Sequence, residues 1–143
     1  MQKVKKAIYP GSFNPFHSGH KEVLKKALKI FDEIYILVAQ NPDKEKNDIK
    51  QNIKNIKLQI NELQNVFIIE NHKNKLTADI AKEMNINFLI RSARNNADYS
   101  YEFQLASINK SINNKLETIL IIPDNQFLKY SSTEIRKIKE KNV

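Results

Sequence analysis

Residues 10–20 have the sequence Pro-Gly-Ser-Phe-Asn-Pro-Phe-His-Ser-Gly-His and contain both glycines of the chain. Because glycine is so rare here, we expect Gly11 and Gly19 where φ is positive or where the backbone closely approaches a ligand. A short apolar run, 6–9, precedes the stretch, and an amphipathic helix pattern follows it. The apolar positions of that helix are Val23, Leu24, Ala27, Leu28 and Phe31. A strand, a glycine-containing turn and a helix that begins near His20 predict an anion site, because free N–H groups at a helix N-terminus attract negative charge.

Beyond this stretch, short apolar runs typical of buried strands alternate with longer amphipathic segments typical of helices. The predicted strands are 6–9, 34–39, 66–69, 87–90 and 118–122. The predicted helices after the first are 48–63, 77–84, 97–112 and one that begins near Ser131, where Ser-Ser-Thr-Glu has capping-box spacing. This alternation predicts one α/β domain over residues 1–143: a Rossmann-like, doubly wound parallel sheet of five strands.

Two of the predicted helices carry an apolar stripe at helical spacing. In 48–63 the stripe consists of Ile49, Ile53, Ile56, Ile60 and Leu63. In 97–112 it consists of Ala97, Tyr101, Leu105, Ile108 and Ile112. Such a stripe packs against a core, although the apolar residues near the end of 97–112 could equally serve a contact between subunits.

The composition excludes several classes of protein. The chain of 143 residues contains no cysteine, which excludes disulfides, thiolate catalysis and cysteine-based zinc sites. No segment approaches eighteen apolar residues and the N-terminus lacks an apolar signal region, so we expect a cytoplasmic protein without membrane contact. The net charge of +8 favours an anionic partner, such as a nucleotide, a nucleic acid or a phosphorylated metabolite.

Arginine is scarce in this lysine-rich chain, and two of its three arginines, Arg91 and Arg94, stand three residues apart. A guanidinium group grips phosphate oxygens through two parallel hydrogen bonds, which lysine cannot do. We therefore predict a phosphate-binding role for both. The alternative is that they pair with carboxylates such as Asp98 or Glu102, and Asp98 could serve only to stabilise a helix N-terminus.

Ligands of doubly wound sheets bind outside the carboxyl ends of the strands, and polar residues gather at that edge of the predicted sheet. Ser12 follows the first strand, Lys44 the second, Arg91 to Arg94 the fourth and Pro123 the fifth. The set contains no acidic cluster that could cage a metal ion and no convincing Ser–His–Asp arrangement. It suits the binding of a polyphosphate.

The opening loop resembles the nucleotidyltransferase superfamily, because His17-Ser18-Gly19-His20 matches its (H/T)xGH signature. The second half is similar to the phosphopantetheine adenylyltransferase family in particular. That family has Arg-Gly-Leu-Arg where this chain has Arg91-Ser92-Ala93-Arg94. Its Asp-Phe-x-Tyr-Glu-x-Gln-x-Ala run matches residues 98–106, and Asn109 and Ser131-Ser132-Thr133 follow as in the family. The resemblance covers about residues 5–138.

The resemblance implies the transfer of AMP from ATP to 4′-phosphopantetheine, which gives dephospho-coenzyme A and pyrophosphate. It implies Mg²⁺ carried on the ATP phosphates with few or no protein ligands. In-line attack by an already anionic phosphate needs no general base and no covalent enzyme intermediate, only alignment and charge neutralisation.

By position, the resemblance also implies a role for individual residues. His20 would stabilise the pentacoordinate α-phosphate, and Ser12 would bridge ATP and acceptor. The catalytic residues would be Ser12, His20, Lys44 and Arg94. The acceptor would be bound by Ser12, Lys44, Leu76, Thr77, Arg91 and Asn109. ATP would be bound by Ser12, Phe13, His17, His20, Ser92, Ala93, Arg94, Asp98, Glu102, Pro123, Phe127, Tyr130, Ser131, Ser132 and Thr133.

Two other functions fit part of the sequence. Residues 11–15 and 131–136 also resemble nicotinate-mononucleotide adenylyltransferases, which lack the run from Asp98 to Asn109. A basic nucleic-acid-binding protein would fit the charge, but aromatic and basic residues do not alternate along a strand as such a surface requires, so we expect no nucleic-acid partner. The family packs as a hexamer, so the resemblance predicts a homo-oligomer, with six subunits as the expected number.

Overall fold

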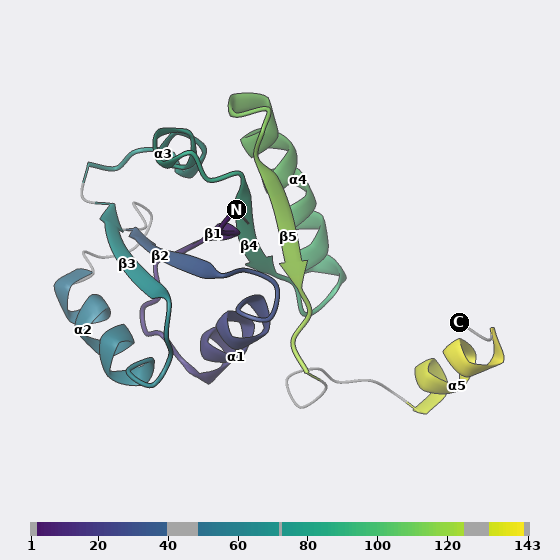
Figure 1. Ribbon diagram of the computed structural model, residues 1–143. Helices are drawn as coiled ribbons and strands as arrows, with labels where there is room; N and C mark the ends of the chain where they lie inside the picture. Colours follow the sequence, from purple (N-terminus) through teal and green to yellow (C-terminus); the bar gives the residue numbers. More distant parts are fainter. Residues whose placement is uncertain (1–2, 40–48, 72, 125–131, 142–143) are drawn as a thin grey trace.

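The computed structural model describes residues 3–39, 49–71, 73–124 and 132–141, in which five strands alternate with five helices (Figure 1). The strands are β1 (Lys6–Gly11), β2 (Glu33–Ala39), β3 (Val66–Asn71), β4 (Phe88–Ser92) and β5 (Glu117–Ile121). The helices are α1 (Ser18–Ala27), α2 (Ile49–Gln59), α3 (Thr77–Met84), α4 (Asn96–Ile112) and α5 (Ser132–Glu140). Every predicted strand and helix is present, with ends shifted by a few residues.

The five strands form one sheet in the order β3-β2-β1-β4-β5, and each neighbouring pair is parallel. β1 lies in the middle, where Ile8 is opposite Tyr35 of β2 and Leu89 of β4. The chain builds outward from β1 to β3, then crosses back to place β4 on the other side of β1. The predicted doubly wound fold is confirmed, and its topological switch point lies between β1 and β4.

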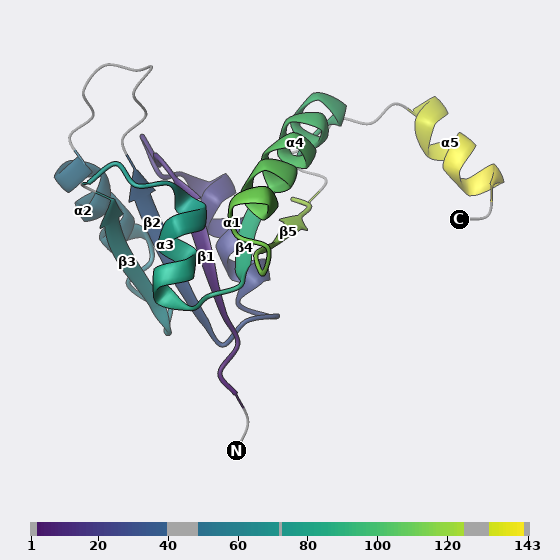
Figure 2. The ribbon, with the colours of Figure 1, turned by 90° about the horizontal axis from the view of Figure 1, so that it is seen from above.

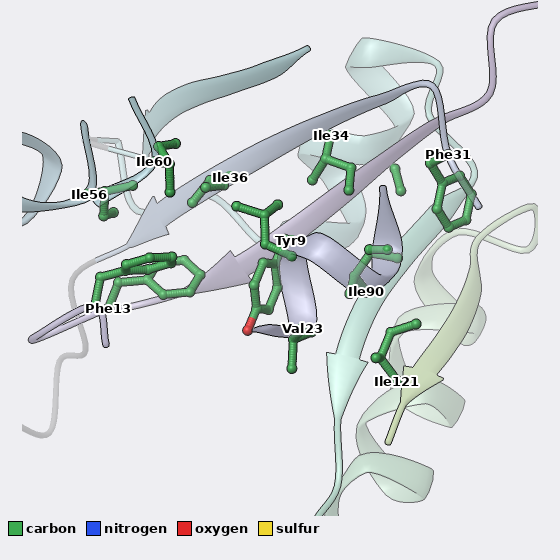
Figure 3. Close-up of a cluster of buried hydrophobic side chains, with 14 of the residues drawn as sticks. Tyr9, Phe13, Val23, Phe31, Ile34, Ile36, Ile56, Ile60, Ile90 and Ile121 are labelled. Carbon is green, nitrogen blue, oxygen red and sulfur yellow. The ribbon is translucent and has the colours of Figure 1, made fainter. Parts of the chain in front are cut away.

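Helices cover both faces of the sheet: α1 and α2 pack on one face, and α3 and α4 lie on the other (Figure 2). Successive side chains of a strand point to opposite faces, so β1 contributes to both cores. Ala7 and Tyr9 join the larger cluster beneath α1 and α2, drawn in Figure 3, while Ile8 joins the smaller one beneath α3. In the central strand β1, Ala7, Ile8 and Tyr9 are consecutive apolar residues because both faces are buried there.

The apolar stripe of α2 faces the core as expected, since Ile56 and Ile60 are buried and its other members pack against them. The stripe of α4 does not. Tyr101 is 60% exposed and Ile108 55%, and the only buried residue of this helix is Glu102. Tyr101 is therefore not a core position, and for Ile108 the alternative of a contact between subunits stays a prediction.

Asparagine takes the left-handed backbone positions that glycine usually fills. Asn65, Asn74 and Asn85 all have positive φ, and Asn85 caps the C-terminus of α3. Asparagine tolerates this conformation better than most residues, which is how a chain with two glycines makes its turns. None of the described helices is long and apolar enough to span a membrane.

Candidate functional site

A pocket of about 760 Å³ opens at the carboxyl ends of β1 and β4, at the switch point of the sheet. It is lined by the end of β1, the loop 12–17 with the first turn of α1, and the end of β4 with the start of α4. The lining residues are Tyr9, Pro10, Gly11, Ser12, Phe13, Asn14, Pro15, His17, Ser18, Gly19, His20, Val23, Arg91, Ser92, Arg94, Asp98, Tyr101, Glu102 and Pro123.

Phe13 folds its ring back over Gly11. It has a φ of 49°, which is unfavourable for a bulky residue, and it is only 3% exposed. A Cβ atom on Gly11 would lie 3.0 Å from the Phe13 ring, so glycine is needed for close packing. Neither glycine has a positive φ, so that alternative is wrong, while a close approach of the backbone to a ligand stays a prediction. In the structure each glycine makes room for a ring of the same loop.

Amide side chains of α2 donate hydrogen bonds to carbonyl groups of this loop. Gln59 donates from Nε2 to the Phe16 carbonyl at 2.7 Å, and Asn52, which is buried, donates from Nδ2 to the Ser12 carbonyl at 3.4 Å. These bonds satisfy loop carbonyls that have no strand partner. The position of the loop beside the pocket thus depends on a helix far away in the sequence.

The first turn of α1 is capped by two histidines. The Gly19 N–H donates to Nδ1 of His17, and the His17 N–H donates to Nδ1 of His20, each at 3.1 Å. The two imidazole rings lie 3.8 Å apart. A Cβ atom on Gly19 would come within 3.0 Å of the His17 ring, so glycine is required here too. This reciprocal capping box places both rings at the pocket and fixes their orientation.

His20 is a neutral hydrogen-bond donor at physiological pH. Burial, together with His17 and Arg94 nearby, lowers its pKa to about 4, so the neutral form predominates at pH 7. Since Nδ1 accepts the His17 N–H, the single ring proton sits on Nε2. The ring stacks on Phe16 and meets the edge of Phe13.

Arg91, at the end of β4, forms a bidentate ion pair with Glu102 of α4. Its Nε and Nη2 each donate to a different Glu102 oxygen at 2.8 Å, and Nη1 donates to the Pro10 carbonyl at 3.1 Å. Burial alone would lower the pKa of Arg91, but Glu102 outweighs it and leaves the pKa above its usual value. Burial likewise raises the pKa of Tyr9 well above its usual range, so its phenol stays neutral beside Arg91.

Arg94 is more open. Its side chain is 64% exposed, and its Nε lies 3.6 Å from Asp98, a loose pair across one turn. Asp98 also accepts the Arg94 backbone N–H at 3.1 Å, while its own N–H donates to Asn95, the N-cap of α4. Asp98 therefore does stabilise the start of α4 while also lining the pocket. The Arg94 guanidinium remains available to an anion.

A polar cluster joins α1 to the segment after β5. Glu22 accepts the Asp124 backbone N–H at 2.9 Å, and Lys26 both donates to the Ile122 carbonyl and pairs with the Asp124 carboxylate, each at 2.7 Å. These bonds attach the segment that contains Pro123, a residue of the pocket, to α1, which is also the helix that carries His20.

The structure brings together most of the predicted site residues whose side chains it describes. Ten line the pocket: Ser12, Phe13, His17, His20, Arg91, Ser92, Arg94, Asp98, Glu102 and Pro123. Four do not line it: Leu76, Thr77, Ala93 and Asn109. Lys44, Phe127, Tyr130 and Ser131 lie outside the described residues. Ser132 and Thr133 begin α5, which Figure 1 draws apart from the sheet, and their side chains are not described.

Outside the stretch 10–20, which the sequence analysis singled out as an anion site, sequence reasoning missed three side chains of the pocket: Tyr9, Val23 and Tyr101. Tyr9 lies near the carboxyl end of β1, just before Pro10 and Gly11, and Figure 3 shows it between Phe13 and Val23. Its position at a strand end was the available signal. Tyr101 stands one residue before Glu102 in a run that already pointed to the site, but it was assigned to the apolar stripe.

Within the described part of the chain, no three histidine or acidic side chains converge as metal ligands would. The pocket instead presents the N-terminal turns of α1 and α4, two arginines and a neutral imidazole donor. Helix N-termini and guanidinium groups attract anions. An Nε2–H can donate a hydrogen bond to a phosphate oxygen on which negative charge develops. The arrangement suits chemistry on a polyphosphate.

The sequence matches the cytidylyltransferase-like family over residues 8–138. It is 45% identical over 137 residues to the phosphopantetheine adenylyltransferase of Mycoplasma mycoides subsp. mycoides, covering 95% of this chain and 97% of that protein. It is 37% identical to the protein of the same name from Vesicomyosocius okutanii, covering 96% and 85%. The fold is similar to that of a bifunctional NMN adenylyltransferase/ADP ribose pyrophosphatase from Francisella tularensis, with a TM-score of 0.58, 16% identity, and coverage of 99% of this chain and 43% of that one.

Proposed function

Because the chain belongs to the phosphopantetheine adenylyltransferases of the cytidylyltransferase-like family, we propose that it transfers the adenylyl group of ATP to 4′-phosphopantetheine. The products are dephospho-coenzyme A and pyrophosphate. A phosphate oxygen of the acceptor forms a bond to the α-phosphorus, and the bond from the α-phosphorus to the oxygen that bridges it to the β-phosphorus breaks. The electron pair leaves with pyrophosphate, so no proton has to be removed from the attacking group at neutral pH.

The observation that carries the proposal is the geometry around His20. A neutral imidazole with its proton on Nε2 lies at the first turn of a helix, inside a pocket with two arginines. A neutral donor stabilises charge that develops on the α-phosphate without needing deprotonation, and burial strengthens that bond. Such a donor acts mainly in the transition state.

The remaining groups of the pocket bind and align the two substrates. We assign the triphosphate to Arg94 and the first turn of α1, because this guanidinium is exposed and the helix N-terminus faces the same space. We assign the acceptor phosphate to Arg91, with Ser12 between the two substrates. Holding two polyanions in line supplies much of the rate enhancement in reactions of this kind.

We propose that magnesium enters as MgATP, bound by phosphate oxygens and water. The donor set of the pocket supports this. Its two carboxylates, Asp98 and Glu102, already accept hydrogen bonds from the Arg94 backbone and the Arg91 side chain, and its histidines use Nδ1 in the helix cap. Magnesium prefers carboxylates with free oxygens and commonly keeps several waters. The ion would neutralise charge on the leaving pyrophosphate.

We further propose a cytoplasmic homo-oligomer, a hexamer by the family resemblance, that contacts neither membranes nor nucleic acid. The exposed apolar residues of α4 support assembly. Tyr99, Phe103 and Ile108 are each more than half exposed, which is an unusual density for one surface helix. A second copy of the chain would bury them.

Release of pyrophosphate from ATP, measured with different acceptors, tests the function. We expect release with 4′-phosphopantetheine and none with nicotinate mononucleotide, which lacks the thiol-bearing arm. The reverse preference would assign the alternative adenylyltransferase activity, and binding of labelled DNA or RNA at physiological salt would revive the nucleic-acid alternative.

A further inference from the structure

The segment after β5 is bonded to α1 on both sides of Pro123. The Ile122 carbonyl accepts a hydrogen bond from Nζ of Lys26 at 2.7 Å, and the Asp124 N–H donates to Oε1 of Glu22 at 2.9 Å. These two backbone groups belong to the peptide units that directly precede and follow Pro123. Since the proline ring also fixes φ, the backbone of Pro123 keeps little freedom.

The place of β5 in the sheet explains why side chains supply these bonds. β5 is an edge strand that pairs with β4, and it ends at Ile121. Backbone groups beyond that end need partners from outside the sheet. Glu22 and Lys26 stand four residues apart and therefore lie on one side of α1, where both reach the segment after β5.

The exposure of this cluster argues against a role in stability alone. Nζ of Lys26 also pairs with the Asp124 carboxylate at 2.7 Å, but that side chain is 64% exposed. Ion pairs with so exposed a partner contribute little to the free energy of unfolding. The bonds to the backbone have a different consequence, because they determine where a residue of the pocket lies relative to α1.

Pro123 lies on the side of the pocket that we assign to ATP. Ile121 is opposite Ser92 in the sheet, and the chain reaches Pro123 two residues beyond the one and Arg94 two residues beyond the other. Both Pro123 and Arg94 line the pocket, as does His20 in the first turn of α1. A shift of Pro123 relative to α1 would therefore change the space for the nucleotide.

We propose that Glu22 and Lys26 are positioning residues for ATP: they fix the backbone of Pro123 against α1, so that Pro123 and His20 keep a constant spacing at the bound nucleotide. The proposal rests on the function proposed above. Neither Glu22 nor Lys26 lines the pocket, so both act through Pro123. An arrangement that is already fixed on folding loses less entropy when the ligand binds.

The test uses Lys26→Met and Glu22→Leu in the full-length protein, with the binding of ATP and of 4′-phosphopantetheine each measured by calorimetry. Each variant removes one of the two bonds to the backbone around Pro123. We expect ATP binding to weaken about tenfold in either variant, the effect of one lost charged hydrogen bond, while acceptor binding changes less than about twofold.

The two variants change the net charge in opposite directions, which separates positioning from electrostatic attraction. Attraction alone would weaken ATP binding in Lys26→Met and strengthen it in Glu22→Leu, whereas positioning weakens it in both. Lys25→Met removes the same charge from the exposed neighbour of Lys26 on α1 and is the matched control, with ATP binding changed less than about twofold. Glu22→Gln keeps an oxygen acceptor for the Asp124 N–H and should stay within about threefold of the wild type.

Three outcomes would overturn the proposal: ATP binding that is unchanged in Lys26→Met, ATP binding that tightens in Glu22→Leu, or an equal loss for both substrates together with a lower melting temperature. The last would mean that the cluster only stabilises the fold. If Glu22→Leu does not fold, Lys26→Met and its control decide. A wild-type protein that binds ATP but not 4′-phosphopantetheine would contradict the proposed function itself, while intact ATP binding in Lys26→Met contradicts only the positioning role.

Discussion

At the scale of single residues, His20 joins two tasks in one ring. Its Nδ1 accepts the His17 N–H and completes the helix cap, and this bond leaves the proton on Nε2 for a ligand. Asparagine at the same position could place Oδ1 where Nδ1 stands, but it has no donor as far out as Nε2. The two tasks can therefore be separated by substitution.

We predict that His20→Asn lowers kcat on the order of 10²–10³-fold, the loss seen when one donor to a developing charge is removed. ATP binding and the melting temperature should stay close to the wild type because the cap is kept. Steady-state kinetics, calorimetry and thermal unfolding measure these quantities. A kcat within about threefold of the wild type would remove His20 from the chemical step.

The low pKa of His20 predicts a pH effect on stability. The unfolded chain has the ordinary histidine pKa near 6.5, while the folded chain holds His20 near 4, so the unfolded state binds more protons between these values. The contribution of His20 to the free energy of unfolding is therefore complete above about pH 6.5 and is lost as the pH falls toward 4. In an NMR titration its ring should stay neutral at pH 5, and titration near 6.5 would contradict this.

At the scale of secondary-structure elements, the two sides of α4 differ in burial and in the kind of side chain they carry. Its inward side contributes Glu102 to the pocket, while Tyr99, Tyr101 and Phe103 remain more than half exposed around it. Exposed apolar patches of this kind often mark contacts with another protein surface. The exposed aromatic residues of α4 therefore support the proposed assembly with a second copy of the chain.

We predict that the wild type scatters light as a multiple of its 16.7 kDa chain mass, and that Phe103→Glu lowers the multiple. A buried charge without a partner is costly at an interface. Leu58→Glu places the same charge on the exposed side of α2 and is the control. A wild-type mass near 16.7 kDa at micromolar concentration would contradict assembly.

The order of elements was predictable because each strand is a short apolar run bounded by turn residues, and each helix repeats at 3.6 residues. The burial of α4 was not, because an apolar stripe at Tyr101 and Ile108 has the same spacing whether it meets its own core or another subunit. The packing of a ring against Gly11 was not predictable for a similar reason. Its neighbour in space, the Phe13 ring, returns to it only through a positive φ that the sequence does not reveal.

The sequence predicted which residues belong to the site better than it predicted the contacts between their side chains. The strand-end rule placed Ser12, Arg91 and Arg94 at one edge, and the structure brings them to one pocket. For Arg91 the sequence left open a pair with a carboxylate such as Glu102 and the binding of phosphate. The side-chain geometry shows the pair with Glu102, and the phosphate-binding role of Arg91 stays a prediction.

At the scale of the whole molecule, the pocket exists because the sheet winds in two directions. The chain leaves β1 toward α1 and leaves β4 toward α4, and the two departing segments separate at the switch point (Figure 1). Both helices then present their N-terminal turns to the same space, which gives a site for two phosphorylated substrates side by side. The fold alone admits many activities, so the decisive evidence is which phosphorus atom is transferred.

The most direct test of adenylyl transfer follows a phosphorus label from ATP into the products. Purified protein is incubated with 4′-phosphopantetheine and ATP labelled with ³²P at either the α- or the γ-phosphate, and the acceptor is separated from the nucleotide. The account predicts that the α-label appears in the acceptor product in equal amount with pyrophosphate, and that the γ-label appears only in pyrophosphate. Transfer of the γ-label to the acceptor, or retention of the α-label in free nucleotide while ATP is consumed, would contradict adenylyl transfer.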